Sequence, residues 1–266
     1  QSLLDFVFDL NVDADNYVHA TTGIPVVNIN LPTEGEVNYK KVVLKFPLTG
    51  GSAHGVSFGT PVGVDDLTGY TFQVGVNIGQ ADPLAANSGL AVPSVIQQRL
   101  NAMTQNIYSI SSVILDIDNI NYTDTDCVVL DPEGNEVPSL ETMLSSFISS
   151  VKNTAGGNPF LLVFNTNLLP SATGMSGIPA FYPTSAQYRT EFYDENFGYD
   201  DRNTLNMMIM TQNDTPPEIS ATQGYPVYLG PGASPPDGLM TICAEQFNSD
   251  YIYDLVLKQI SDSMQH

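Results

Sequence analysis

The clearest helical pattern in the sequence lies at residues 139–153, and it constrains what the rest of the chain can form. Apolar residues recur there at intervals of three and four, which places them on one face of a helix. They are Leu140, Met143, Leu144, Phe147, Ile148 and Val151. Ser139 suits the N-cap, and the Gly156–Gly157 pair should end the helix. A helix with so wide an apolar face requires a large apolar surface to pack against.

Two further segments are predicted to be helical. Residues 93–106 begin with Pro93, which suits a first turn, and carry Ile96 and Leu100 at helical spacing. Residues 238–266 read as a short apolar strand that runs into a closing helix. With the helix at 139–153, this closing helix supplies most of the helical apolar surface.

The remaining apolar segments alternate with a period of two, which indicates strands. The strongest is 70–78, where Tyr70, Phe72, Val74, Val76 and Ile78 share one face. The other predicted strands are 3–10, 25–31, 42–46, 113–122, 160–164, 187–193 and 204–211. Strand 42–46 is expected to end at Pro47, which cannot donate to a ladder, and the glycines from Gly50 to Gly59 are expected to form a turn region.

The order of these segments predicts an α+β fold, with an elongated, highly twisted antiparallel sheet wrapped around amphipathic helices. No internal repeat or low-complexity linker divides the sequence. We therefore expect residues 1–266 to form a single elongated domain, either whole or excised from a longer protein. The chain opens at Gln1, which fits a processed or excised product.

The charge balance excludes several classes of partner. Asp and Glu number 29 against 8 Lys and Arg, which gives a formal net charge of −21. A field of that sign repels nucleic acids and anionic bilayers. No apolar run approaches the length of a transmembrane segment. The composition favours a secreted or extracellular protein.

No catalytic or metal-binding motif in the sequence is complete. Gly55 to Gly59 matches G-x-S-x-G around Ser57, but the only downstream histidine is His266. Pairs such as Asp116/Asp118 and Asp124/Asp126 lack the other ligands of a calcium loop. We predict no catalytic residues, no cofactor and no metal. Cys127 and Cys243 could form one disulfide or remain two buried thiols.

Residues 204–211 are distinctive because Met207, Met208 and Met210 fall within four positions. Methionine makes a surface that adapts to a flexible apolar partner, although an ordinary core strand would also carry these residues. This strand, the Pro-rich loop after it, and the run from Gly238 into Phe247 and the closing helix resemble the tubular lipid-binding (TULIP) superfamily. The pattern is similar to the bacterial branch found beside clostridial neurotoxins and covers residues 160–266.

The resemblance implies a non-enzymatic protein that holds a lipid or other apolar small molecule in a groove between sheet and helix. The residues expected to line the groove are Met207, Met208, Ile209, Met210, Leu144, Phe147, Ile148, Val151, Ile252, Leu255 and Val256. The alternative is a secreted structural or interaction protein, such as an adhesin, a coat protein or a toxin-accessory domain. Its Pro/Gly-rich loops would then meet a protein partner.

Overall fold

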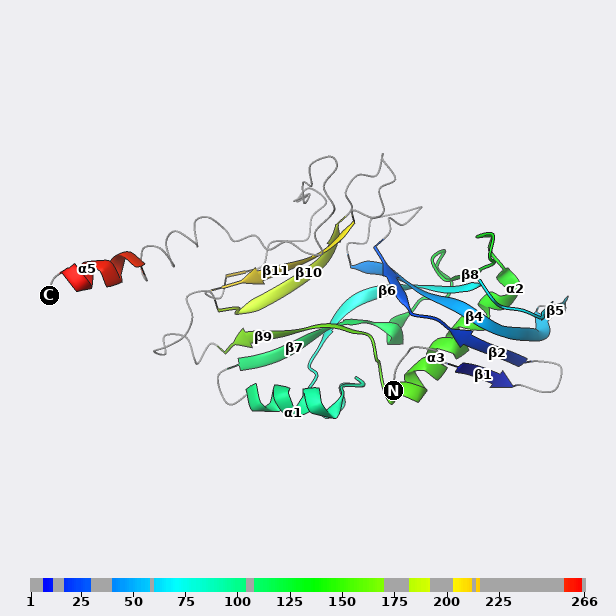
Figure 1. The fold of residues 1–266 in the computed structure, drawn as a ribbon, viewed down its shortest axis with the longest axis horizontal. Helices are drawn as coiled ribbons and strands as arrows, with labels where there is room; N and C mark the ends of the chain where they lie inside the picture. The colour runs from blue at the N-terminus through cyan, green and yellow to red at the C-terminus, as the bar shows by residue number, and fades with distance from the viewer. Residues whose placement is uncertain are drawn as a thin grey trace.

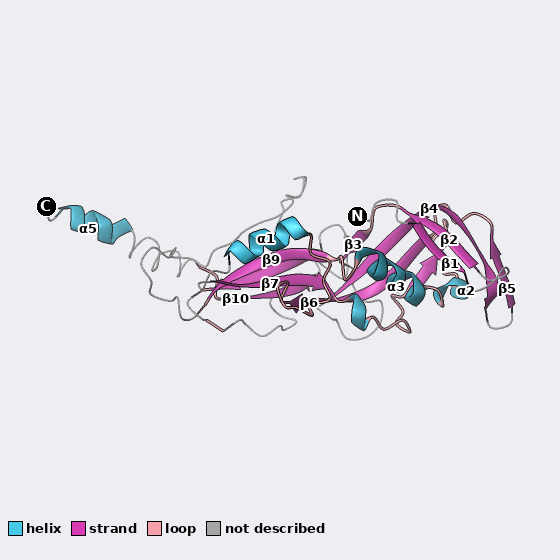
Figure 2. Cartoon of the chain, turned by 90° about the horizontal axis from the view of Figure 1, so that it is seen from below, coloured by secondary structure: helices cyan, strands magenta, loops and turns pink. Residues whose placement is uncertain are grey.

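The computed structural model describes residues 7–11, 17–29, 40–57, 60–103, 108–169, 182–191, 203–211, 214–215 and 256–264. It is a mixed fold that consists mostly of antiparallel sheet with few helices (Figure 1). The larger sheet is strongly curled, like half of a barrel (Figures 1 and 2). This architecture agrees with the α+β prediction.

Nine strands of the described residues form the larger sheet. They are β1 (Val7–Asn11), β2 (Tyr17–Thr22), β3 (Val26–Asn28), β4 (Lys41–Ser57), β5 (Thr60–Val64), β6 (Thr71–Ala81), β7 (Tyr108–Leu115), β8 (Val128–Leu130) and β9 (Leu161–Leu168). The main path runs β1-β2-β4-β6-β7-β9, and each neighbouring pair is antiparallel. Strands β3 and β5 also pair with β4, and β8 pairs with β6.

The remaining elements are a second sheet and short helices. Strands β10 (Ser185–Glu191) and β11 (Thr204–Met210) pair antiparallel with each other. The helices are α1 (Ser94–Met103), the 3-10 helix η1 (Ile117–Asn119), α2 (Pro138–Glu141), α3 (Leu144–Ala155) and α5 (Lys258–Met264). Figure 1 shows α3 under the curled sheet and α5 set apart from both sheets.

The long strand β4 contradicts the prediction that pairing stops at Pro47. Pro47 lies where β4 exchanges partners, because β3 pairs with residues 43–45 and β2 begins to pair at Leu48. The missing N–H therefore falls between two ladders, while the Pro47 carbonyl still accepts a hydrogen bond from Gly23 N at 2.7 Å.

The glycines after Pro47 do not form the predicted turn region, since Gly50, Gly51 and Gly55 all lie inside β4. Gly59 lies outside the described residues. Gly51 has φ +120°, and a Cβ there would lie 2.0 Å from the carbonyl oxygen of His19 on β2. Only glycine allows this close approach of the two strands.

Two other predicted elements are interrupted or end early. The helix predicted at 139–153 breaks at Thr142–Met143 into α2 and α3, and it ends at Gly156 with φ +76° as predicted. The strand predicted at 113–122 ends at Leu115, and η1 begins two residues later at Ile117. Asn119 Nδ2 donates to the Asp116 carboxylate, a local bond that favours the turn over an extended strand.

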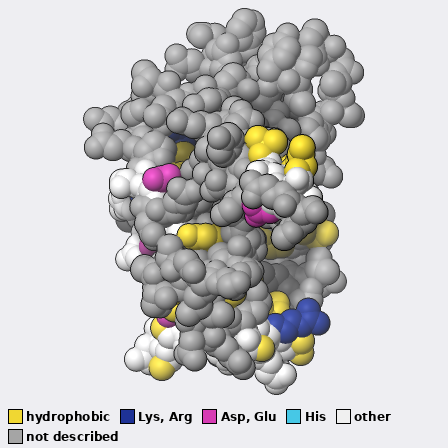
Figure 3. All heavy atoms as spheres, turned by 90° about the vertical axis from the view of Figure 1, so that its left-hand side faces the viewer, with side chains coloured by type: hydrophobic (Ala, Val, Ile, Leu, Met, Phe, Trp, Pro, Cys, Tyr) yellow, Lys and Arg dark blue, Asp and Glu magenta, His cyan; other side chains and the backbone are white. Residues whose placement is uncertain are grey.

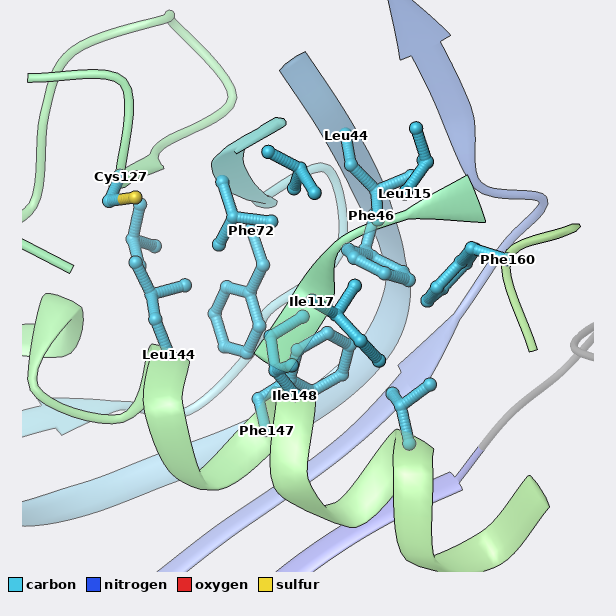
Figure 4. Packing of buried hydrophobic residues seen from close by; sticks show 14 of the residues in the cluster. Leu44, Phe46, Phe72, Leu115, Ile117, Cys127, Leu144, Phe147, Ile148 and Phe160 are labelled. Atoms are coloured by element: carbon cyan, nitrogen blue, oxygen red, sulfur yellow. The ribbon is translucent and has the colours of Figure 1, made fainter. Parts of the chain in front are cut away.

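The core lies between α3 and the concave side of the curled sheet. The Phe147 ring on α3 packs edge-on against Phe8, Phe46 and Phe72, with centroids 5.3, 4.8 and 5.0 Å away. These rings come from β1, β4 and β6, and each is at most 1% exposed. Figure 4 shows Leu144, Phe147 and Ile148 pointing together into the sheet. The predicted apolar face of β6 is also confirmed, because Phe72, Val74, Val76 and Ile78 are all buried.

Replacing Phe147 with alanine should destabilise the protein by about 3–5 kcal/mol. The substitution leaves a cavity and removes the ring contacts to three strands at once. Urea denaturation followed by circular dichroism measures this loss. Ser145→Ala, at an exposed position of the same helix, is the matched control and should change stability by less than about 0.5 kcal/mol. Equal effects of the two substitutions would contradict the central position of Phe147.

Candidate functional site

The residues predicted to line a groove fall in separate places. Leu144, Phe147, Ile148 and Val151 belong to the core cluster, and none is more than 2% exposed. Their side chains join α3 to the sheet. Val256, just before α5, is 38% exposed. Ile252 and Leu255 lie outside the described residues.

The predicted methionine strand, by contrast, exposes an apolar surface. On β11, alternate residues Leu205, Met207 and Ile209 are 39%, 44% and 42% exposed. We call these three residues the β11 row. Met208 and Met210, which alternate with the row, are half-buried. Figure 3 shows apolar side chains reaching the surface at the end of the molecule that faces left in Figure 1.

Strand β10 connects this exposed row to the rest of the molecule. Its residues Ala186, Tyr188 and Thr190 pair with Ile209, Met207 and Leu205 respectively. Tyr188 belongs to the core cluster and Ala186 packs against it. The Ala186 carbonyl accepts a hydrogen bond of 3.1 Å from Gln80 Nε2, at the end of β6. The β10–β11 pair lies on the opposite side of β7 and β9 from α1 (Figure 1).

Strand β10 also carries buried polar atoms that have no hydrogen-bond partner. They are Ser185 Oγ, Gln187 Oε1, Tyr188 OH and Thr190 Oγ1. Tyr188 is 5% exposed and Thr190 is fully buried. Burial raises the pKa of Tyr188, so its hydroxyl keeps its proton at neutral pH. An unsatisfied buried group of this kind costs about 1–3 kcal/mol, and within the described part of the chain all such atoms lie on this one strand.

The sequence predicted the strand that holds Tyr188 and Thr190 but gave these two residues no role. Nothing in their spacing separates them from surface residues of an alternating strand. Their burial depends on pairing and packing with distant segments, such as the end of β6 at Gln80. The one available signal was the neighbouring methionine strand, which the sequence did identify.

Carboxylates of the Asp124/Asp126 and Asp116/Asp118 pairs form ion pairs with lysines. Lys41 Nζ lies 2.7 Å from Asp124 Oδ2 and 2.7 Å from Asp126 Oδ2. Gly75 on β6 makes room for this contact, since a Cβ there would lie 2.6 Å from Lys41 Cε. Asp118 pairs with Lys152 at the other carboxylate pair. Among the described residues, no three His, Cys, Asp or Glu side chains gather closely enough to hold a metal ion.

The ion pairs around Lys41 shift the pKa values of Lys41 and Asp124. Burial alone would lower the pKa of Lys41, but the hydrogen bonds and charges of Asp124 and Asp126 outweigh it and raise that pKa. The hydrogen bond from Lys41 lowers the pKa of Asp124. Because the Asp124 pKa is lowered on folding, its contribution to stability is present above the unfolded value and is lost as the pH falls.

The G-x-S-x-G match does not form a nucleophile elbow. Ser57 ends β4, and β5 follows and pairs antiparallel with β4 where the motif would need a helix. The nearby His54 contacts Asp65, with Nε2 3.1 Å from Oδ1. Cys127 is a buried free thiol whose Sγ donates to the Asn121 carbonyl at 3.3 Å. Burial raises the pKa of Cys127, and Cys243 lies outside the described residues.

Comparison of the sequence with models of known protein families and with curated proteins found no match. In the described part of the chain, none of the helices is long and apolar enough to cross a membrane.

Lys41→Met should lower stability at pH 7 by about 1–3 kcal/mol, because it leaves Asp126 poorly solvated and without its cation. The loss should shrink toward pH 3.5, because Asp124 of the variant lacks the hydrogen bond that lowers its pKa and loses its charge there. Urea denaturation at both pH values measures it. The control is Lys152→Met at the more exposed pair with Asp118, which should cost at most about 1 kcal/mol. A loss for Lys41→Met that is independent of pH would contradict the ion-pair account.

Proposed function

We propose that this protein is a non-enzymatic binding protein that holds a lipid or another apolar ligand against the β11 row. The observation that carries the proposal is the exposure of Leu205, Met207 and Ile209 on one face of a two-stranded sheet. Contiguous apolar side chains at a surface are typical of binding sites. Methionine in the centre of the row can adapt its shape to a flexible chain.

The architecture we propose is the elongated, twisted sheet of the TULIP superfamily. The curled sheet with α3 on its concave side supports this assignment. In this protein we place the ligand at the β10–β11 pair, because Phe147 and its neighbours fill the space between α3 and the sheet. The proposed apolar surface is thus distinct from the contacts of Phe147, while Tyr188 of β10 ties the smaller sheet to the same core cluster.

The energetics suit a single acyl or alkyl chain. Burial of each methylene contributes about 0.8 kcal/mol. The β11 row spans four residue steps, or about 13 Å along the strand, so one extended chain can contact all three side chains. The net charge of −21 favours an uncharged ligand over an anionic one. The same charge supports the proposal of a secreted or extracellular location.

The alternative function is interaction with a protein partner. The Pro/Gly-rich loops at 169–183 and 212–238, which would meet that partner, lie almost wholly outside the described residues. If the protein binds a partner protein, that partner would cover the β11 row. Native mass spectrometry distinguishes ligand binding from partner binding. Lipid released by organic extraction supports ligand binding, whereas a stable oligomer without lipid supports the alternative.

Replacing both Met207 and Ile209 with glutamine should weaken the binding of dodecan-1-ol by about 10- to 100-fold, because two apolar side chains leave the contact. Bound alcohol is measured by gas chromatography after equilibration with the protein. The matched control replaces Val26 and Val27 on β3, which are 47% and 41% exposed, with glutamine. This control should keep full binding. Equal loss in both double variants, or no loss in either, would remove the β11 row as the ligand surface.

A further inference from the structure

We propose that the ligand carries a neutral hydrogen-bonding head, such as an alcohol or an ester, and that Tyr188 and Thr190 receive it. This inference rests on the proposed function, because it names the chemical class of the ligand at the same site. A polar end to the site would make it bind amphiphiles more tightly than plain hydrocarbons.

The first argument is the concentration of unsatisfied polar atoms. Tyr188 OH and Thr190 Oγ1 are buried without a partner, whereas buried hydroxyls in native proteins nearly always have one. The buried Asn158 shows the usual situation, since its Nδ2 donates to the Leu115 carbonyl at 2.7 Å. A ligand oxygen that forms a hydrogen bond with a hydroxyl of β10 would remove the free-energy cost of leaving that hydroxyl buried without a partner.

The second argument is the face on which these hydroxyls lie. Paired residues of an antiparallel sheet share a face, with Cβ atoms about 5 Å apart. Tyr188 pairs with Met207 and Thr190 pairs with Leu205, so both hydroxyls share the face of the β11 row. Tyr188 and Thr190 are about 7 Å apart along the strand. A head group beside the apolar chain would therefore lie on the same side of the sheet as both hydroxyls.

The third argument concerns the charge of the head. The protein carries a net charge of −21, which disfavours a carboxylate or a phosphate. The one cation on β10, Arg189, alternates onto the opposite face and has an interaction of its own. Burial raises the pKa of Tyr188, so its hydroxyl remains a donor. An alcohol or ester oxygen accepts from such a donor without bringing a charge.

The test compares dodecan-1-ol with dodecane, each equilibrated with the protein at equal fractions of its aqueous saturation and measured by gas chromatography. Tyr188→Phe should weaken the binding of dodecan-1-ol about three- to tenfold, which corresponds to the loss of one hydrogen bond. The binding of dodecane should be unchanged. Thr190→Val is the second variant and should act in the same direction. Ser185→Ala is the matched control, because it removes an unpartnered hydroxyl from the other face of the same strand. Ser185→Ala should leave the binding of both ligands unchanged.

The thermal stability of the ligand-free variants gives an independent result. Tyr188→Phe should not lower the melting temperature, because the hydroxyl that it removes makes no hydrogen bond. A lower melting temperature would show that the hydroxyl has a structural partner and would overturn the inference. Equal weakening of alcohol and hydrocarbon in Tyr188→Phe would also overturn it. If the native protein binds both ligands equally well, only the polar head is disproved. Binding of neither ligand disproves the proposed function as well.

Discussion

The packing of the Phe147 ring against three other phenylalanines is the contact on which the curled sheet depends. Phe8, Phe46 and Phe72 lie on β1, β4 and β6, and α3 supplies the ring that all three contact. Phe46 and Phe72 are directly paired on neighbouring strands, and the curl of the sheet brings the inward side chain of β1, two strands from β4, toward them. One aromatic residue can then contact all three rings. The edge-on geometry of the three contacts is the arrangement that aromatic rings prefer.

This filled interior determines where a ligand can bind. Leu144, Ile148 and Val151 complete the apolar face of α3, and their near-zero exposure leaves them to the core. The apolar side chains without such a partner include the β11 row, which lies on the smaller sheet. The proposed binding surface is therefore on the smaller sheet, which contributes Tyr188 to the core cluster. An apolar chain on the exposed side chains of the β11 row would leave the packing of Phe147 in place.

The sequence predicted those parts of the fold that depend on local periodicity. The buried face of β6 and the apolar face of α3 follow from spacings of two and of three or four. The extent of β4 could not be predicted, since Pro47 is tolerated only because β3 and β2 pair on either side of it. The contact of Lys41 with Asp126 joins residues far apart in the chain, and no local pattern contains it. For the candidate site, the methionine strand was recognised, but its exposed face and the buried hydroxyls of β10 depend on the tertiary structure.

The charge distribution supports the proposal that the ligand is a neutral amphiphile and not a charged lipid. Two of the eight cationic side chains, Lys41 and Lys152, are paired with Asp124, Asp126 and Asp118 within the fold. They are thus unavailable to a phosphate or carboxylate head. The excess of acidic residues adds a repulsive field over the whole surface. For the proposed ligand, affinity would then come from apolar contact and from neutral hydrogen bonds, and the β10–β11 pair carries apolar side chains and unpartnered hydroxyls on one face.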